Sequence, residues 1–492
     1  MGLFFQRIRH LRSTCVKQGL LHRPWIGLIV LAILSLLLRF WQLKRFNHLV
    51  FDEVYFANFA NSYLQGNAPD DAHPPLGKYI IAAGIWLGDW LNDGRLTGGA
   101  IAPEIGLSPL SYRQANALVG SLLPLLVVGI AYQIGHRLSA PRRWIFSLLS
   151  GLFVAIDGLF ITESRYALLN IHMAFFGLLG HWLWLWARFL PEEQARKQVF
   201  WRLLAGVALG SAIAIKWNSL GFLLSLILWE MWLWWDRHFA CPYPNGRDVH
   251  STRGFWHSAK DLEWEAIQKS EHSRNFIFLI FVPTLTYCLF WWPHLHITQE
   301  RFLSLHIRLF SFHQQIGAGG HAACSKWFTW PLLVKPITYW YEKIGAQSYT
   351  VNNLGNPALW LFSSSAVCLL LVYTLSRLKS RLSHHTSIYL PNKREPVGAY
   401  LLISYMANWL PWMWVERCTF NYLYMPAAVY SFMTLAWLLS EWLRSVSKVT
   451  RIAAWICLGL IAISFLFWLP LALGLPLSPR SLQIRWWLKS WI

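Results

Sequence analysis

Long apolar blocks, separated by short polar segments, constrain this chain more than any other feature. Residues 25–38 and 275–292 are two such blocks, and each approaches the ~20 residues that a helix needs to cross a bilayer. Only 13% of the residues are charged, whereas a soluble domain carries about a quarter. The sequence therefore predicts an all-α integral membrane protein, not a large soluble protein with buried helices. We expect about eleven spans, at residues 25–42, 114–135, 144–160, 166–187, 199–215, 217–235, 275–293, 356–376, 397–414, 420–442 and 452–475.

The net charge of +20 is distributed in a way that indicates topology and not a nucleic-acid site. The basic residues lie in short segments between the apolar blocks, where they orient the spans and contact anionic lipid headgroups. With the N-terminus in the cytoplasm, most of the 43 Lys and Arg residues fall on the cytoplasmic side, in agreement with the positive-inside rule. We expect a multi-pass protein of the cell membrane with a cytoplasmic segment 1–24, a membrane domain 25–475 and an extracytoplasmic tail 476–492.

Two of the predicted extracytoplasmic loops are long, at about residues 43–112 and 294–355. Long loops in a compact protein are usually functional, so we expect the active residues to lie there. Within the first loop, residues 76–92 are apolar but are interrupted by glycine and aspartate. This stretch predicts an interfacial or re-entrant helix.

The seven cysteines are scattered along the chain, and no two of them form a CxxC motif. Several lie inside apolar blocks, where cysteine behaves as a small hydrophobic residue. This arrangement indicates neither a disulfide framework nor a zinc site.

Two adjacent carboxylates, Asp52 and Glu53, directly follow the first apolar block in the segment HLVFDEVYFA. Charged residues beside a membrane-embedded helix are costly and are usually kept for function. The same residues would also suit the start of a helix over VYFANFA, where an acid caps the N-terminus and complements the helix dipole. The residues alone leave both interpretations open.

A second polar cluster is the segment DAHPPLGK at residues 71–78. Its two prolines fix the backbone and end any preceding helix, and Gly77 permits the close approach of another chain. His73 and Lys78 would then stand on a rigid turn, where they could meet a phosphate. Taken alone, an ordinary proline-rich turn with a snorkelling lysine explains this pattern better.

Further ionisable residues lie at the ends of apolar blocks, all on the outer side of the predicted topology. An isolated arginine or lysine at such a position is usually an interface anchor. Several of them converging on one side would form a cationic pocket rimmed by carboxylates, which suits a lipid phosphate and a nearby general base. These residues are Arg113, Asp157, Glu163, Arg165, Lys216 and Arg417.

The order of several motifs along the chain closely resembles the protein O-mannosyltransferase family. FDEVYFANFA, DAHPPLGKYIIAAG and SYRQANALVGSLLPLL come first, followed by DGLFITESRYALLN and IKWNSLGF. FTWPLLVKPITYWY, LGNPALW and RCTFNYLYMP complete the series, so the resemblance extends over about residues 50–430. HPPLGK with an upstream DE pair is fairly specific, and the ordered set is strong support for the resemblance.

The resemblance implies a polytopic GT-C transferase whose active site faces the extracytoplasmic side. Members of the family take mannose from dolichyl- or polyprenyl-phosphate mannose and pass it to Ser or Thr hydroxyls of secreted proteins. Asp52 would be the catalytic carboxylate and Glu53 its partner, while other residues would surround the donor phosphate or shape the site. Those other residues are His73, Lys78, Arg113, Arg165, Lys216 and Arg417.

The sequence departs from the family pattern at three points. Asn170 stands where many relatives have Asp, and Leu423 stands where many have His, so the choice of acceptor or the rate could differ. The sugar-binding-like luminal domain of eukaryotic relatives is absent, since only residues 294–355 fill the second loop. The chain therefore resembles a bacterial member, with a polyprenyl donor in place of a dolichyl donor.

The expected chemistry is a single displacement at the anomeric carbon of the donor. Asp52 would take the proton of the acceptor hydroxyl, cations would hold the charge of the leaving phosphate, and a β-linked donor would give an α-linked product. Asp52 and Glu53 could hold a divalent cation, or arginine and lysine could replace one, so the sequence leaves the need for a metal open.

Two other functions fit parts of the pattern. A GT-C transferase acting on a lipid or glycan would keep the fold and change the acceptor, although HPPLGK and LGNPALW favour a protein acceptor. A transporter or flippase for a lipid-linked sugar would also use intramembrane charges. Transport would be supported by paired broken helices and internal repeats, and the sequence displays neither.

Overall fold

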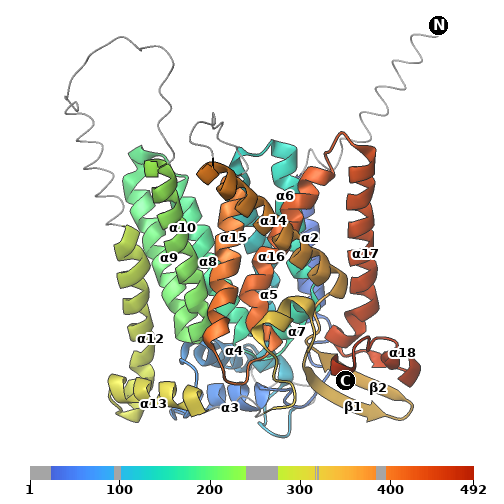
Figure 1. Cartoon of the computed structure of the whole chain (residues 1–492). Helices are drawn as coiled ribbons and strands as arrows, with labels where there is room; N and C mark the ends of the chain where they lie inside the picture. Colours follow the sequence, from blue (N-terminus) through green and yellow to red (C-terminus); the bar gives the residue numbers. More distant parts are fainter. Residues whose placement is uncertain are drawn as a thin grey trace, which may run out of the picture.

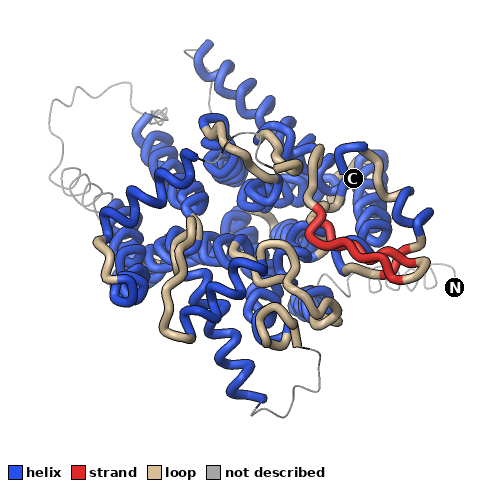
Figure 2. The backbone as a smooth tube through the Cα atoms, turned by 90° about the horizontal axis from the view of Figure 1, so that it is seen from below, coloured by secondary structure: helices blue, strands red, loops and turns tan. Residues whose placement is uncertain are grey.

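The computed structural model describes residues 24–92, 101–239, 275–315, 317, 321–383 and 395–491, so the predicted cytoplasmic segment 1–24 lies outside them except for Pro24. Long helices stand side by side in one bundle, and the short helices and a small sheet gather at one end of it (Figure 1). Figure 2 looks onto this end, where loops run across the helix ends and the sheet lies toward one edge.

Each of the eleven predicted spans coincides with a helix in the described part of the chain. Six of the described helices are long and apolar enough to cross a membrane, or seven if a bent pair counts as one span. The protein is therefore a mostly helical, multi-pass membrane protein. The helices that coincide with the eleven predicted spans are α2 (Pro24–Phe40), α5 (Pro109–Ile134), α6 (Ala140–Ala155), α8 (Asn170–Arg188), α9 (Ala195–Ile215), α10 (Leu220–Phe239), α12 (Val282–Thr298), α14 (Pro357–Ser383), α15 (Glu395–Trp409), α16 (Met425–Trp442) and α17 (Lys448–Leu473).

The bent pair consists of α6 and a short helix, α7 (Gly158–Arg165), which meet at 58°. Asp157 starts α7, because one of its carboxylate oxygens accepts two backbone amide protons of the first turn. The other oxygen accepts from the backbone N–H of Asn356 and the indole N–H of Trp360, so the bend is fixed by the distant LGNPALW motif.

The two long loops that the sequence predicts to be extracytoplasmic contain most of the short elements. The first loop holds α3 (Glu53–Leu64) and α4 (Leu76–Asn92), and α4 occupies the stretch predicted as an interfacial helix. The second loop holds α13 (Phe302–Gln315) and two strands. The predicted tail also folds here, since it contains α18 (Pro479–Gln483) and a third strand.

The expectation of a purely α-helical chain was wrong at this small antiparallel sheet, which has the order β1-β2-β3. β1 (Thr338–Ile344) and β2 (Gln347–Asn352) are rich in aromatic and β-branched residues, which favour strands. Gly345, with a φ of 59°, supplies the tight turn between them. β3 (Pro476–Leu477) then pairs with β2.

Single helical turns join several of the long helices. Two 3-10 turns matter for the site, namely Trp217–Ser219 between α9 and α10 and Asn421–Tyr424 before α16. The others are Gly135–Arg137, Glu192–Gln194, Trp327–Leu332, Leu410–Trp414 and Lys489–Trp491, and a π-helical turn, Ile277–Phe281, precedes α12.

Cys324 and Cys418 form a disulfide, which the scattered positions of the cysteines did not indicate. They are 94 residues apart, in the second long loop and in the segment before α16. Neither cysteine belongs to a local motif, and only the fold brings them together. Cys288, Cys368 and Cys457 are free among the described cysteines.

Candidate active site

Asp52 stands at the N-terminus of α3, and its carboxylate has no hydrogen-bond partner among the described residues. It does not cap the helix, so the capping interpretation of this residue does not hold. Phe51, directly before it, has a left-handed φ of 55°, and its ring stacks on Tyr339 with centroids 4.1 Å apart. A bulky residue keeps this costly conformation only where its surroundings hold it, so the packing of Phe51 fixes the turn that presents Asp52.

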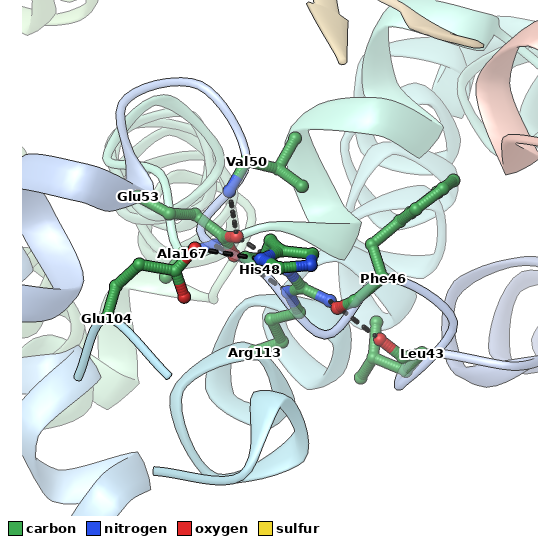
Figure 3. Close-up of polar contacts among 8 residues, drawn as sticks. All are labelled: Leu43, Phe46, His48, Val50, Glu53, Glu104, Arg113 and Ala167. Carbon is green, nitrogen blue, oxygen red and sulfur yellow. Dashed lines mark hydrogen bonds and ion pairs between the residues drawn. The ribbon is translucent and has the colours of Figure 1, made fainter. Parts of the chain in front are cut away.

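Glu53, the next residue, points into the protein and is fully buried (Figure 3). Its carboxylate oxygens accept from Arg113 at 2.7 and 2.8 Å, and from two backbone amides, those of Val50 and Ala167. Arg113 donates its three other N–H groups to backbone carbonyls of the preceding loop, those of Leu43, Phe46 and His48. All five donors of Arg113 are thus used within the protein, and we place it in the scaffold instead of beside a donor phosphate.

Lys78 also finds its partners within its own turn. Its ammonium pairs with the Asp71 carboxylate and donates to the backbone carbonyl of His73. A Cβ on Gly77 would come within 2.7 Å of a terminal methyl group of Leu169, so glycine lets this turn pack closely against Leu169 where it enters α4. These contacts fix the conformation of the turn, and Lys78 stabilises it through its bonds to Asp71 and His73.

Arg165 closes the end of α2 and does not reach a cavity. Its guanidinium donates to four backbone carbonyls in the last turn of α2 and just beyond it, those of Leu38, Arg39, Trp41 and Gln42. Arg39 in turn donates to the carbonyls of Val154 and Ala155 at the end of α6. Both arginines satisfy carbonyls that a helix end leaves without partners, so we assign them a structural role.

A cavity of about 370 Å³ opens in front of Asp52, and we call it the Asp52 cavity. α3 supplies one wall, α13 supplies the opposite wall, and the turn before α4 supplies the floor. Arg308 of α13 spans the cavity rim, with its guanidinium 2.7 Å from Asp70 and 2.8 Å from Glu300. The lining residues are Asp52, Tyr55, Phe56, Phe59, Asp70, Asp71, Ala72, His73, Arg308, Leu309 and Phe312.

A second cavity, of about 580 Å³, shares Ala72 and His73 with the first, and we call it the Lys216 cavity. Its polar end contains Lys216, Arg417 and His313. Its long wall is apolar and is built by α10 and by the segment that follows α15. The wall residues include Leu220, Leu223, Leu224, Ile227, Pro411, Trp412 and Val415.

Lys216 joins the end of α9 to the following 3-10 turn. Its ammonium donates to Oδ1 of Asn170 at 2.9 Å and lies 5.0 Å from the ring centre of Tyr422. Asn170 donates to Glu163, and Lys216 forms no ion pair with the described residues, so its charge remains available for an anion. Asn170 and Leu423, the two residues expected to depart from the family pattern, both lie near Lys216, because Leu423 also lines this cavity.

The electrostatic surroundings of Asp52 suit a general base. Burial raises the pKa of its carboxyl to about 6, while Lys216 lowers that pKa and Asp71 raises it. A carboxyl with this pKa is mostly ionised at neutral pH and is a stronger base than an ordinary aspartate. His73 is neutral, because burial and the charge of Lys216 hold its pKa well below its usual range.

The carboxylate pair does not fit a divalent cation. The oxygens of Glu53 are occupied by Arg113 and by two backbone amides, so Glu53 cannot join Asp52 as a ligand. Within the described part of the chain, no three His, Cys, Asp or Glu side chains are placed to hold a metal ion. The cationic side chains that line the two cavities are Lys216, Arg308 and Arg417.

Four of the predicted site residues line the two cavities, namely Asp52, His73, Lys216 and Arg417. The predicted site residues that line neither of these two cavities are Glu53, Lys78, Arg113 and Arg165. Sequence reasoning did not single out His313 or Arg308, which line the cavities from α13. No motif marks α13, and only the fold lays this helix against the first loop.

Two family profiles match consecutive parts of the chain. The profile described as "Dolichyl-phosphate-mannose-protein mannosyltransferase" matches residues 29–298. The profile described as "C-terminal four TMM region of protein-O-mannosyltransferase" matches residues 298–491.

Similar proteins of known name extend over nearly the whole chain. A polyprenol-phosphate-mannose–protein mannosyltransferase of Mycolicibacterium smegmatis is 24% identical over 506 residues, covering 90% of this chain and 87% of the relative. The protein of the same name from Mycobacterium tuberculosis is 23% identical and covers 95% of this chain and 92% of the relative.

Solved structures share the fold. The protein O-mannosyltransferase Pmt1-Pmt2 complex of S. cerevisiae bound to the sugar donor matches with a TM-score of 0.77 at 15% identity, covering 96% of this chain and 93% of that one. ArnT from Cupriavidus metallidurans bound to undecaprenyl phosphate matches with a TM-score of 0.54 at 14% identity, covering 91% and 65%.

Proposed function

Because this chain belongs to the dolichyl-phosphate-mannose-protein mannosyltransferase family, we propose that it carries out mannosyl transfer with Asp52 as the general base. The chain is a glycosyltransferase that moves mannose from a polyprenol-phosphate-mannose donor to proteins. Because the chain belongs to this family, we favour transfer of mannose to proteins over transfer to a lipid or glycan, and over transport of a lipid-linked sugar. The acceptor groups in our proposal are Ser and Thr hydroxyls of secreted or membrane proteins.

The observation that carries this proposal is that two neighbouring cavities, one with Asp52 and one with Lys216, share Ala72 and His73 in their walls. The phosphate of the donor would lie at the polar end of the Lys216 cavity, between Lys216 and Arg417. The prenyl chain would follow the apolar wall along α10, where burial of its methylene and methyl groups stabilises binding. The mannose would then face the Asp52 cavity, which is open to an acceptor.

The reaction follows from this arrangement as one displacement. Asp52 takes the proton of the acceptor hydroxyl while the hydroxyl oxygen bonds to the anomeric carbon. The bond between that carbon and the phosphate oxygen breaks, and its electron pair leaves with the phosphate. Lys216 and Arg417 stabilise the charge that develops on the phosphate. Because the hydroxyl and the phosphate occupy opposite faces of the sugar, a β-linked donor gives an α-linked product.

We further propose a GT-C membrane domain at residues 25–475 with about eleven spans, a cytoplasmic N-terminus and an extracytoplasmic active site. The Cys324–Cys418 disulfide supports this orientation, because disulfides form and persist in oxidising compartments. In a variant that retains only these two cysteines, Ala72→Cys should react with an impermeant thiol reagent in intact cells, and Gly246→Cys should not. If the reagent modified only Gly246→Cys, the proposed topology would be wrong.

Product analysis with purified protein tests the function. Polyprenyl-phosphate mannose and a Ser/Thr-containing peptide should yield a mannosylated peptide, and the same peptide with Ala at every Ser and Thr should yield none. The anomeric proton and carbon signals of the product should report an α linkage. A β linkage would contradict the single displacement, and transfer to lipid without any transfer to peptide would contradict the acceptor class.

A further inference from the structure

The Cys324–Cys418 disulfide joins the second long loop to the segment that carries Arg417. Cys418 directly follows Arg417, which lines the Lys216 cavity. Cys324 precedes the 3-10 turn Trp327–Leu332. The disulfide therefore ties the backbone beside a cavity-lining cation to a segment that lies 94 residues away in the sequence.

The chain around Arg417 has little regular structure of its own. It runs between the 3-10 turns Leu410–Trp414 and Asn421–Tyr424. Contacts with the opposite segment hold it beside the disulfide. The backbone N–H of Ser325 donates to the carbonyl of Thr419 at 2.8 Å, and the Thr419 hydroxyl donates to the carbonyl of Ser325 at 2.6 Å.

Arg417 itself is held weakly. Among the described residues, its guanidinium makes one hydrogen bond, at 3.3 Å, to the backbone carbonyl of Cys418, and no ion pair. Arg113 differs from it, because five hydrogen bonds fix that guanidinium. The position of Arg417 in the cavity therefore depends on the backbone that carries it, and the disulfide is attached to that backbone one residue away.

We infer that the Cys324–Cys418 disulfide is a positioning element that keeps Arg417 in the Lys216 cavity, so that the oxidised enzyme binds its lipid-phosphate donor more tightly than the reduced enzyme. The inference rests on the proposed function. The disulfide forms when the two thiols exchange with a disulfide-bearing oxidant, which takes up their two electrons and two protons and becomes a dithiol. A phosphine reductant reverses the step.

Steady-state kinetics of the full chain in nanodiscs test this inference. Replacing both cysteines, Cys324→Ser with Cys418→Ser, should raise the KM for polyprenyl-phosphate mannose about tenfold, as the loss of one charge-assisted contact would, and should also lower kcat, because Arg417 stabilises the charge of the leaving phosphate. A phosphine reductant should produce the same rise in the wild type and none in the double variant. Cys288→Ser with Cys368→Ser, two free cysteines, is the matched control and should leave the KM unchanged.

A double-mutant cycle separates positioning from general stability. Arg417→Gln should raise the donor KM in the oxidised enzyme, and opening the disulfide in that variant should raise it no further. Additive effects on the KM would overturn the inference. An unchanged donor KM in the folded, reduced wild type would also overturn it, and so would unfolding upon reduction, since the disulfide would then serve the fold alone. Absence of transfer by the oxidised wild type would instead overturn the proposed function.

Discussion

Asp52 and Glu53 are neighbours in the sequence and carry the same functional group, but they lie in two regions with opposite properties. Glu53 belongs to a scaffold in which both carboxylate oxygens and all five donors of Arg113 have protein partners. Asp52 faces a cavity in which its carboxylate has no partner among the described residues. The backbone turn between Phe51 and α3 divides the two regions.

The same division separates the basic residues. Arg113 and Arg165 are buried and donate several hydrogen bonds each to carboxylate or carbonyl oxygens, whereas Lys216 and Arg417 face a cavity with few partners. A paired buried charge fixes geometry, and its removal leaves an uncompensated partner. A charge that faces a cavity can bind a ligand, and changing it should alter catalysis more than folding. Substitutions on each side of this division should therefore affect different measurements.

The largest effect should come from Asp52→Asn. The amide keeps the shape of the side chain but cannot accept a proton, so mannosyl transfer should fall ~10²–10⁴-fold. The thermal unfolding midpoint should stay near that of the wild type, because the carboxylate holds no described partner. Radiolabelled transfer to a peptide and a melting curve of the same preparation measure both quantities. Near-normal transfer would show that another group removes the proton.

Glu53→Gln should have the opposite effect to Asp52→Asn, because it should lower the stability of the protein and leave the activity of the folded fraction unchanged. Breaking a buried ion pair leaves the Arg113 guanidinium without its counter-charge, which costs about 3–5 kcal/mol of folding free energy. The unfolding midpoint in detergent should fall, and activity should be lost in proportion to the unfolded fraction. Arg113→Gln should behave similarly, and the combined variant should lose less than the sum of the two. A stable Glu53→Gln protein without activity would move Glu53 into the catalytic group.

This division could not be read from the sequence, although much of the fold could. The apolar spans depend on local composition, and each predicted span coincides with a helix. Arg113 and Lys216 look alike in sequence, since both are basic residues at the end of an apolar block. What distinguishes them is a partner 60 residues away for Arg113 and an open cavity for Lys216.

Other features escaped prediction for the same reason. The bend at Asp157 depends on hydrogen bonds to Asn356 and Trp360, which lie about 200 residues further along the chain. The disulfide joins cysteines 94 residues apart without a spacing motif. The family resemblance pointed to Asp52 as the base that we propose, but it could not tell residues that face the cavities from residues that hold the site in shape.

Charge removal on the cavity side should have an intermediate effect. Lys216→Met should lower kcat/KM for the donor about 10- to 150-fold, which corresponds to the roughly 1.5–3 kcal/mol of one charge-assisted hydrogen bond. Folding should be preserved, because Lys216 has only a neutral amide as a hydrogen-bond partner. Lys343→Gln, an exposed lysine on β1, serves as a matched control and should leave kcat/KM unchanged. Equal, mild effects of both changes would make Lys216 an interface anchor.

The smallest expected effect is a shift in pH dependence, and it tests the link between the two cavities. Asp52 must be ionised to accept a proton, and its pKa is raised to about 6. The kcat/KM for the donor should therefore be full above neutral pH and should fall on the acid side with a midpoint near pH 6, since this parameter reports ionisations of the free enzyme. Lys216 lowers the pKa of Asp52, so its removal should raise that pKa. The acid limb of Lys216→Met should accordingly lie at a higher pH than that of the wild type, and the limb of Lys343→Gln should not move. If the acid limb of the kcat/KM profile did not move in Lys216→Met, the two cavities would be electrostatically independent. If the wild-type acid limb lay near pH 4, Asp52 would be an ordinary, solvated carboxylate.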